Sequence, residues 1–454
     1  MEQLEKMRTY FESGATQSYE FRKAQLEKLK AVVIKYEQEI FDALHKDLRK
    51  SKEESYVSEN GFFLSELTAT LSKLKNWMKQ ESVSTNLLNF PSKSFIVSEP
   101  LGVVLIISPW NYPFNLLMTP LLGAIAAGNC VVMKPSELAP ATEAVMKKII
   151  ESTFDKNYVL YVEGDGATVV PALMNNFIFD HVMYTGSTAV GKIIYELAAK
   201  NLVPVTLELG GKSPCIVEAD ADIKVAAKRI AMAKFSNAGQ TCVAPDYILV
   251  QETVKDEIID EIKKAIIQFF GIDAQKTEAF GRIINKRQFD RLEKYLNNGK
   301  LLAGGKTDKA DLYIEPTLLE INNMEEAVMQ AEIFGPILPI ISFKKTNEAV
   351  AIIKQHKNPL AFYIFTSSKE KEEKWLQLVP AGGGCINNVT MHLTNHKLPF
   401  GGRGASGTGS YHGKFSFDTF SHKKSVLKTP TWLDPSIKYP PFNGKLNFFK
   451  KVMK

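Results

Sequence analysis

Cysteine is scarce in this chain, with only four among 454 residues. Cys130, Cys215, Cys242 and Cys385 lie far apart, without a CxxC pair and without a His/Cys cluster of metal-ligand spacing. This pattern excludes a disulfide framework and a zinc site built on paired cysteines. We therefore expect free thiols in a reducing compartment and no bound metal.

Long hydrophobic runs are also missing. The most apolar stretch, residues 116–132, is interrupted by Pro120, Gly123 and Asn129 and is shorter than the ~20 residues of a spanning helix. The first eight residues carry acidic side chains and lack the apolar core of a signal peptide. We expect cytoplasmic residence and no stable membrane insertion. The aromatic and basic residues of 445–454 are of the kind found at membrane surfaces, but a solvated or partner-docked tail is the favoured interpretation.

Charge is not concentrated anywhere in the sequence. The 56 basic and 50 acidic residues give a net charge of +6, and the basic residues are spread along the chain. No zinc-finger or helix-turn-helix spacing is present, so nucleic acid is an unlikely partner. The length and the 45% hydrophobic content suffice for two or more cores of a globular protein.

The order of apolar runs predicts an α/β fold. Residues 17–82 have the periodicity of helices, and after residue 102 short apolar strands alternate with helices. This alternation is typical of a parallel sheet covered on both faces, which binds nucleotides at its strand ends. The predicted strands are 103–107, 131–133, 159–162, 181–184 and 204–209, and the predicted helices are 114–127, 141–152 and 188–200.

Two further features divide the chain. Gly210-Gly211 precedes a second βα series that runs from Cys215 to about Asn388, and residues 83–97 form two β-prone runs around a proline. We expect a Rossmann-like cofactor domain (1–82 and 99–209), a second α/β catalytic domain (210–399) and a small β flap for oligomerisation (83–98 and 400–440).

Cys242 is the candidate nucleophile. Residues 223–235 have the pattern of an amphipathic helix, and Asn237-Ala238-Gly239 would end it and present the sulfur of Cys242 on a loop. Taken alone, a free cysteine is more often a small buried hydrophobe. Candidate partners elsewhere in the chain decide between the two interpretations.

Two polar residues follow predicted strands. Glu208 ends an apolar strand and is followed by Leu209-Gly210-Gly211, where its carboxylate could act as a base. Asn111 follows the strand 103–107 and could donate a hydrogen bond to an oxyanion. A solvated strand-end acid and a turn-forming asparagine are the ordinary alternatives.

Two segments could face a dinucleotide. Lys134 and Glu137 follow one predicted strand, and the run Gly186-Ser187-Thr188-Ala189-Val190-Gly191 follows another at the start of a helix. The run lacks the GxGxxG spacing of the usual pyrophosphate turn, and a lysine after a strand is usually solvated. By motif alone the nucleotide site is weakly indicated.

Seven segments in one order resemble the signature of aldehyde dehydrogenases, over nearly the whole chain. The short N-terminus and Tyr411-His412-Gly413-Lys414 resemble the dimeric class-three branch, which includes enzymes for fatty and aromatic aldehydes. The segments are Pro109-Trp110-Asn111-Tyr112-Pro113, Lys134-Pro135-Ser136-Glu137, Gly186–Gly191, Glu208-Leu209-Gly210-Gly211-Lys212, Gly239-Gln240-Thr241-Cys242, Glu332-Ile333-Phe334-Gly335-Pro336 and Pro399-Phe400-Gly401-Gly402.

The resemblance implies a reaction for the three candidate catalytic residues. Cys242 would attack the aldehyde, and the Asn111 amide with the Cys242 backbone N–H would hold the oxyanion. Hydride would then pass to nicotinamide. Glu208 would activate the water that hydrolyses the thioester to a carboxylate.

The resemblance also implies the cofactor contacts and a homodimer. Lys134 and Glu137 would lie near the adenosine ribose, and Gly186 and Ser187, in the turn that Gly191 ends, near the pyrophosphate. Glu332 and Phe334 would contact the nicotinamide ribose. NAD is the expected cofactor, because Glu137 would repel a ribose 2′-phosphate, and NADP stays possible.

The sequence departs from that branch at two positions. Asn388 stands where an acid is usual, and Arg403 stands in a glycine loop where a small residue is common. Both are expected to affect the substrate mouth or loop packing. Three alternatives stay open: acyl transfer to coenzyme A or phosphate, a cysteine hydrolase without nicotinamide, and a structural role without turnover.

Overall fold

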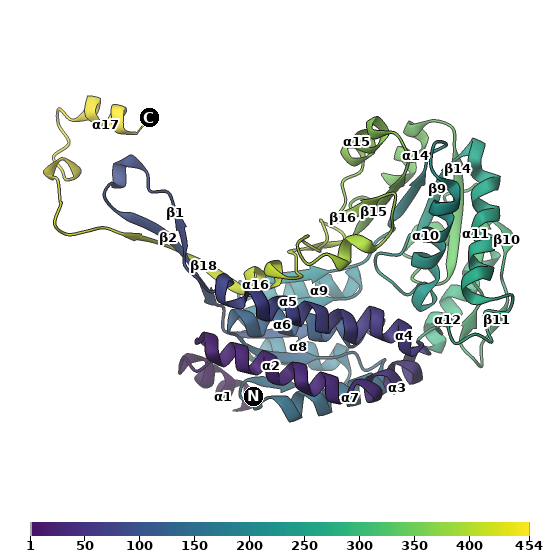
Figure 1. Ribbon diagram of the computed structural model, residues 1–454, viewed down its shortest axis with the longest axis horizontal. Helices are drawn as coiled ribbons and strands as arrows, with labels where there is room; N and C mark the ends of the chain where they lie inside the picture. Colours follow the sequence, from purple (N-terminus) through teal and green to yellow (C-terminus); the bar gives the residue numbers. More distant parts are fainter. Residues whose placement is uncertain (1, 454) are drawn as a thin grey trace.

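The computed structural model describes residues 2–453, which form two α/β units and a projecting arm (Figure 1). The first unit surrounds a six-stranded sheet, in which β17 runs antiparallel to its neighbour and the other strands are parallel. In spatial order the strands are β17 (Gly407–Thr408), β7 (Val205–Glu208), β6 (His181–Thr185), β3 (Val103–Ile107), β4 (Cys130–Lys134) and β5 (Val159–Tyr161).

The chain order of these strands places a crevice beside β3. From β3 the chain moves outward through β4 to β5, and it then returns to β6 and β7 on the other side of β3. Right-handed crossovers in opposite directions put the connecting helices on opposite faces of the sheet. A reversal of this kind leaves an open crevice at the carboxyl ends of the two central strands, here β3 and β6. The connecting helices are α6 (Asn115–Ala127), α7 (Pro140–Thr153), α8 (Gly166–Asn176) and α9 (Thr188–Ala199).

An N-terminal helical layer packs against α6 and α7. It confirms the helical prediction for residues 17–82, except at two places. Residues 81 and 82 belong to a strand, β1 (Glu81–Val83). Residues Tyr56–Asn60 form a π-helical turn, η1, which periodicity did not predict. The helices of this layer are α1 (Glu2–Glu12), α2 (Tyr19–Lys35), α3 (Glu37–Leu48), α4 (Lys52–Ser55) and α5 (Gly61–Trp77).

The second unit contains a seven-stranded sheet that is parallel except for its edge strand β10. Its spatial order is β10 (Lys300–Ala303), β13 (Thr317–Glu320), β14 (Ile337–Phe343), β9 (Tyr247–Gln251), β8 (Pro214–Val217), β15 (Ala361–Phe365) and β16 (Gly383–Ile386). The helices are α10 (Ile223–Phe235), α11 (Lys255–Phe270), α12 (Lys286–Glu293), α13 (Ala327–Gln330), α14 (Thr346–Ile353) and α15 (Lys369–Leu378), and β11 (Thr307–Asp308) pairs with β12 (Tyr313–Ile314).

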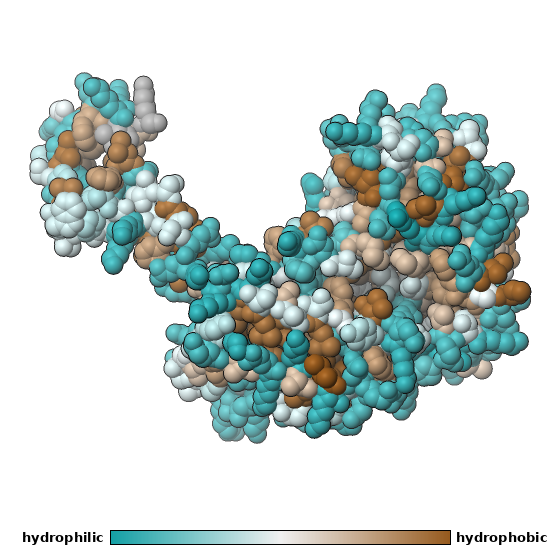
Figure 2. Space-filling model, in the orientation of Figure 1, coloured by the Kyte–Doolittle hydropathy of each residue, from teal (hydrophilic) through white to brown (hydrophobic). Residues whose placement is uncertain are grey.

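The arm consists of β1 (Glu81–Val83), β2 (Lys93–Pro100) and β18 (Ser421–Lys428), in a three-stranded antiparallel sheet. The β1–β2 pair confirms the predicted hairpin, and the C-terminal segment with α17 (Leu446–Val452) lies beside it (Figure 1). Figure 2 shows hydrophobic residues on this arm. Leu87 and Phe90, between β1 and β2, and Trp432, after β18, are largely exposed. A helix, α16 (Lys414–Thr419), connects β17 to β18 and packs on α6.

Buried apolar strands form the centre of the hydrophobic core in each of the two α/β units. Every residue of β3, β4, β6, β8 and β15 is buried, as expected for parallel strands covered on both faces. Cys130 and Cys215 are buried in β4 and β8, whereas Cys385 is only partly buried. None of the helices within residues 2–453 has the length and apolar character needed to cross a bilayer.

Candidate active site

Three of the predicted site residues follow strands of the first sheet at the crevice. Asn111 lies in the loop after β3, Gly186 follows β6 directly, and Glu208 is the last residue of β7. The backbone N–H of Gly186 donates to the carbonyl of Glu208 at 3.0 Å. The parallel arrangement therefore brings residues that are nearly 100 positions apart in the sequence to one edge of the sheet.

The loop that carries Cys242 has an unusual backbone. Helix α10 ends at Phe235, and Asn237, Ala238 and Gly239 then adopt left-handed φ angles of 51°, 50° and 75°. A Cβ atom at Gly239 would lie 2.2 Å from the carbonyl oxygen of Gly335. Glycine is thus required there by both conformation and space. The turn confirms that the helix breaks before the thiol.

Cys242 lies where two cavities meet. The larger encloses about 470 Å³ and the smaller about 200 Å³, and Cys242 and Glu208 line both. Apolar side chains dominate the larger cavity, among them Phe62, Leu116, Met232, Met391 and Phe400. The smaller cavity is more polar and includes Trp110, Asn111, Gly186, Ser187, Glu332 and Phe334. The thiol and the carboxylate can therefore reach the contents of both cavities.

The thiol of Cys242 is partly buried and is protonated in this environment. Burial raises the pKa of Cys242 to about 12, and the negative charges of Glu332 and Glu208 add to the effect. Because only the thiolate is a strong nucleophile, a base must take the proton of the sulfur before or during attack.

Glu208 has an uncommon environment for a carboxyl group. Its side chain is 2% exposed, and neither oxygen has a hydrogen-bond partner within residues 2–453. Burial raises its pKa well above the usual range of glutamate. An unpaired buried carboxyl is costly for folding, so one aimed into a cavity beside a thiol is a functional-site signal.

Asn111 is held beside the cysteine loop. Its side-chain Nδ2 donates to the carbonyl of Gln240, two residues before Cys242, at 2.9 Å. The amide nitrogen has two protons, so a second one is available for an oxygen atom in the smaller cavity. This geometry suits a donor to an oxyanion formed on the Cys242 sulfur adduct.

Glu332 lies against the Gly210-Gly211 pair that separates the two units in the sequence. A Cβ atom at Gly210 would lie 2.0 Å from a carboxylate oxygen of Glu332, so the glycine makes room for this side chain. Burial raises the pKa of Glu332 to about 8, and the charge of Asp246 adds to it. Phe334, two residues on, packs edge-to-face with Trp110 across the smaller cavity, with ring centroids 5.4 Å apart.

Comparison with known proteins agrees with this geometry. The Aldehyde dehydrogenase family profile matches residues 2–426. The chain is 48% identical to 4,4′-diaponeurosporen-aldehyde dehydrogenase of Staphylococcus aureus, over 98% of this chain and 97% of that protein. This chain belongs to the aldehyde dehydrogenase family. It is an enzyme of the oxidoreductase class that acts on aldehydes.

Other relatives of this aldehyde dehydrogenase extend the comparison. A rat protein named aldehyde dehydrogenase, dimeric NADP-preferring, is 44% identical over 98% of each chain. The solved structure of substrate-bound Staphylococcus aureus AldH has a TM-score of 0.98 at 47% identity, covering 100% of this chain and 99% of that one. An indole-3-acetaldehyde dehydrogenase in complex with NAD⁺ has a TM-score of 0.85 at 28% identity, covering 94% and 88%. The predicted family and α/β fold are confirmed.

Some predicted site residues lie elsewhere in this aldehyde dehydrogenase. Lys134 is the buried last residue of β4, and its ammonium group lies 3.2 Å from Glu137, away from the two cavities. Gly191 lies inside α9, where a Cβ atom would meet Leu209 at 2.7 Å. Lys134 and Glu137 are thus separated from the thiol. Such a separation is expected of residues that contact adenosine, because the adenosine lies far from the reacting end of a dinucleotide.

Asn388 and Arg403, the two departures from the family branch, are not among the residues lining either cavity. The side chain of Asn388 accepts from the backbone N–H of Val389, and Arg403 is exposed in a turn closed by Ser406. The hydrogen bonds at both positions are therefore made to residues nearby in the sequence.

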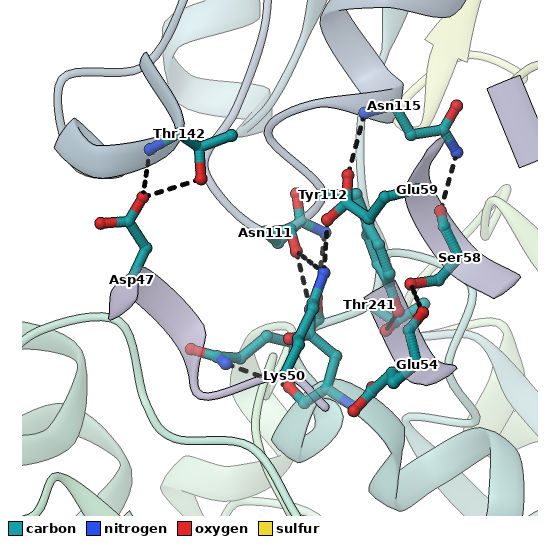
Figure 3. Close-up of polar contacts among 12 residues, drawn as sticks. Asp47, Lys50, Glu54, Ser58, Glu59, Asn111, Tyr112, Asn115, Thr142 and Thr241 are labelled. Carbon is teal, nitrogen blue, oxygen red and sulfur yellow. Dashed lines mark hydrogen bonds and ion pairs between the residues drawn. The ribbon is translucent and has the colours of Figure 1, made fainter. Parts of the chain in front are cut away.

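A polar cluster that the sequence did not predict lies behind this site and is drawn in Figure 3. Lys50, Glu54 and Glu59 come from the helical layer and contact the loops of Asn111 and Cys242. Their sequence signal is weak, because Lys and Glu on a helical segment normally face solvent. Glu59 lies in the π-helical turn Tyr56–Asn60, a geometry that often marks functional sites.

Proposed function

We propose that this enzyme oxidises apolar aldehydes to carboxylates with NAD or NADP, through a covalent intermediate on Cys242. The observation that supports this most strongly is that Cys242 and the unpaired carboxyl of Glu208 lie at the junction of an apolar and a polar cavity. One cavity suits the tail of an aldehyde, and the other suits a hydride acceptor.

The smaller cavity has groups that fit a nicotinamide dinucleotide. Gly186 and Ser187 precede α9, whose N-terminal N–H groups favour a pyrophosphate, and the Glu332 carboxylate can accept from ribose hydroxyls. When bound there, the oxidised nicotinamide would accept the hydride, which carries both electrons of the oxidation. The names of relatives support both cofactors, since one is NADP-preferring and another was solved with NAD⁺.

The residues of the chain carry the remaining chemistry. The sulfur of Cys242 forms a C–S bond with the carbonyl carbon, and the proton of the thiol passes to a solvent water molecule. The free N–H of the Asn111 amide and the backbone N–H of Cys242 hold the resulting oxyanion. Loss of hydride from that carbon yields a thioester on Cys242.

Glu208 completes the cycle. Its ionised carboxylate takes a proton from a water molecule, which attacks the thioester and breaks the C–S bond. The products are a carboxylate and the free thiol, so the oxygen added to the aldehyde comes from water. Because the pKa of Glu208 is raised, it lies closer to neutral pH than the pKa of an ordinary glutamate, which suits a general base.

The larger cavity favours aldehydes with a long or bulky apolar tail. Its lining is mostly aliphatic and aromatic, and the Staphylococcus aureus relative is named for a carotenoid aldehyde, 4,4′-diaponeurosporen-aldehyde. The exposed hydrophobic side chains of the arm support a homodimer, and one relative is named dimeric. Cytoplasmic residence stays a prediction.

The test uses purified protein with a panel of aliphatic and aromatic aldehydes and with NAD or NADP. We expect NADH or NADPH absorbance and a carboxylate product, and no turnover by Cys242→Ala. Absence of reduced cofactor with every aldehyde would favour a hydrolase. An acyl-CoA product in the presence of coenzyme A would favour the acyl-transferring alternative.

A further inference from the structure

A fully buried ion pair lies directly behind the loop of Asn111. The Nζ atom of Lys50 is 2.6 Å from a carboxylate oxygen of Glu59, and both side chains are 0% exposed. Two further groups surround the lysine: Nζ donates to the backbone carbonyl of Asn111 at 3.0 Å and lies 4.0 Å from the ring centroid of Tyr112. Figure 3 shows Lys50 pointing at this loop.

The ion pair holds the Asn111 loop at both ends. Lys50 binds the carbonyl of Asn111, and the second oxygen of Glu59 accepts from the backbone N–H of Asn115 at 2.9 Å, where α6 begins. Five residues of chain, 111–115, are thus fixed between one cation and one anion. The negative charge of Glu59 also complements the N-terminus of α6.

A second set of contacts joins this loop to the loop of the nucleophile. Asn237, the first left-handed residue before Cys242, donates from Nδ2 to the same Asn111 carbonyl at 2.8 Å. Its backbone N–H donates to Glu54 at 2.7 Å. Tyr112 and Thr241 share a hydrogen bond of 2.7 Å next to Cys242. Lys50, Glu54 and Glu59 therefore form a polar clamp on both catalytic loops.

Stability alone is a poor explanation for this clamp. Removing two charges from water costs several kcal/mol each, and apolar residues of similar volume often serve a core equally well. Glu59 lies in the π-helical turn η1, a geometry enriched at functional sites. A charged pair with directional hydrogen bonds does what apolar packing cannot do, because it fixes the position of particular backbone atoms.

We propose that Lys50 and Glu59 are positioning residues that hold the Asn111 amide at the correct distance from the Cys242 adduct. This inference rests on the proposed function of Asn111 as oxyanion donor. Lys50 does not line either of the two cavities that Cys242 lines, so any effect of Lys50 on the reaction passes through the Asn111 loop. Because a displacement of about 1 Å in a catalytic group can cost ~100-fold in rate, a small shift of this loop suffices.

The test is a double-mutant cycle between Lys50→Met and Asn111→Ala, measured as kcat with a saturating aldehyde and NAD. We expect Asn111→Ala to lower kcat by ~100-fold to ~1000-fold, as loss of an oxyanion donor does. Lys50→Met should lower kcat by at least ~10-fold in the wild-type background and by less than ~3-fold in the Asn111→Ala background. The KM for NAD should not change in either background.

Two further variants keep the outcome interpretable. If Lys50→Met fails to fold because it leaves Glu59 unpaired, Lys50→Met combined with Glu59→Gln removes both charges and is used in the same cycle. Arg22→Met is the matched control, since Arg22 is also a buried cation that donates to backbone carbonyls, of Thr16 and Ala126, but at the opposite end of α6. It should lower thermal stability without lowering kcat.

Each result has a distinct meaning. An equal loss of kcat from Lys50→Met in both backgrounds, or no loss in either, would overturn the positioning role and leave the proposed function intact. If Asn111→Ala keeps normal turnover, the oxyanion role and this inference are both wrong. Wild-type protein that oxidises no aldehyde would overturn the proposed function itself, and the inference with it.

Discussion

Replacing Glu208 with glutamine should separate the two halves of the proposed reaction. The neutral amide of the variant cannot accept a proton from water, whereas attack by Cys242 and loss of hydride do not require that step. We expect Glu208→Gln to release about one equivalent of NADH per site in a rapid burst, followed by turnover slowed by ~100-fold to ~10,000-fold, the range for loss of a general base. Stopped-flow absorbance of NADH measures both phases.

The same variant should change how stability depends on pH. The carboxyl of Glu208 is 2% exposed, and its pKa is raised well above its ordinary value of 4.5. Between those two pKa values the folded protein keeps the proton and the unfolded chain has released it. The free energy of unfolding therefore falls by up to about 1.4 kcal/mol per pH unit from this group alone.

Glutamine removes this dependence. The stability of Glu208→Gln relative to wild type should grow as the pH rises above the ordinary glutamate pKa of 4.5, measured by urea unfolding. Glu218→Gln is the control, because Glu218 is also buried but accepts from Trp375 at 2.8 Å, outside the site. Glu208→Gln with unchanged steady-state turnover, or with no burst, would refute the role of this residue.

Three further predictions concern the cysteine loop, the cofactor and the apolar cavity. Gly239→Ala should destabilise the protein and lower activity, because its Cβ atom would lie 2.2 Å from the Gly335 oxygen; thermal unfolding and kcat check this. Glu137→Gln should raise kcat/KM for NADP relative to NAD by removing a negative charge near the proposed adenosine ribose, and unchanged preference would contradict that placement. Met391→Trp should lower kcat/KM for long aldehydes more than for short ones, since Met391 lines the larger cavity, and an equal effect on both would argue against that cavity as the substrate site.

The sequence predicted the parallel strands and the local environment of Cys242 well. Strands such as β3 are continuous apolar runs because both faces are covered, and the helix break at Asn237 follows from residues that tolerate left-handed φ. Both signals are local, and a local signal can be interpreted without the rest of the chain. The three catalytic roles came instead from resemblance to a family, and their geometry now supports a proposal.

The clamp could not be predicted from sequence, for a physical reason. Lys50 and Glu59 lie nine positions apart in a charged helical segment, where solvent exposure is the usual outcome. Their burial depends on the Asn111 loop, more than 50 residues later, and Glu54 binds the cysteine loop, more than 170 residues later. Contacts of that sequence separation leave no periodic pattern. Gly210 likewise resembled a boundary between units, although its lack of a side chain makes room for Glu332.

The first sheet can be completed only after β17, which lies near the C-terminal end of the chain, has been synthesised. Gly407 pairs with Glu208, and the backbone N–H of Leu209 donates to Ser406. Ribosomes add about 5–20 residues per second, so the roughly 200 residues between these partners take about 10–40 s to make. During that interval β7 is an unpaired edge, which can pair with other chains. Nascent chains that stop before Ser406 should therefore depend on chaperones for solubility, whereas chains released after Thr408 can close this edge themselves.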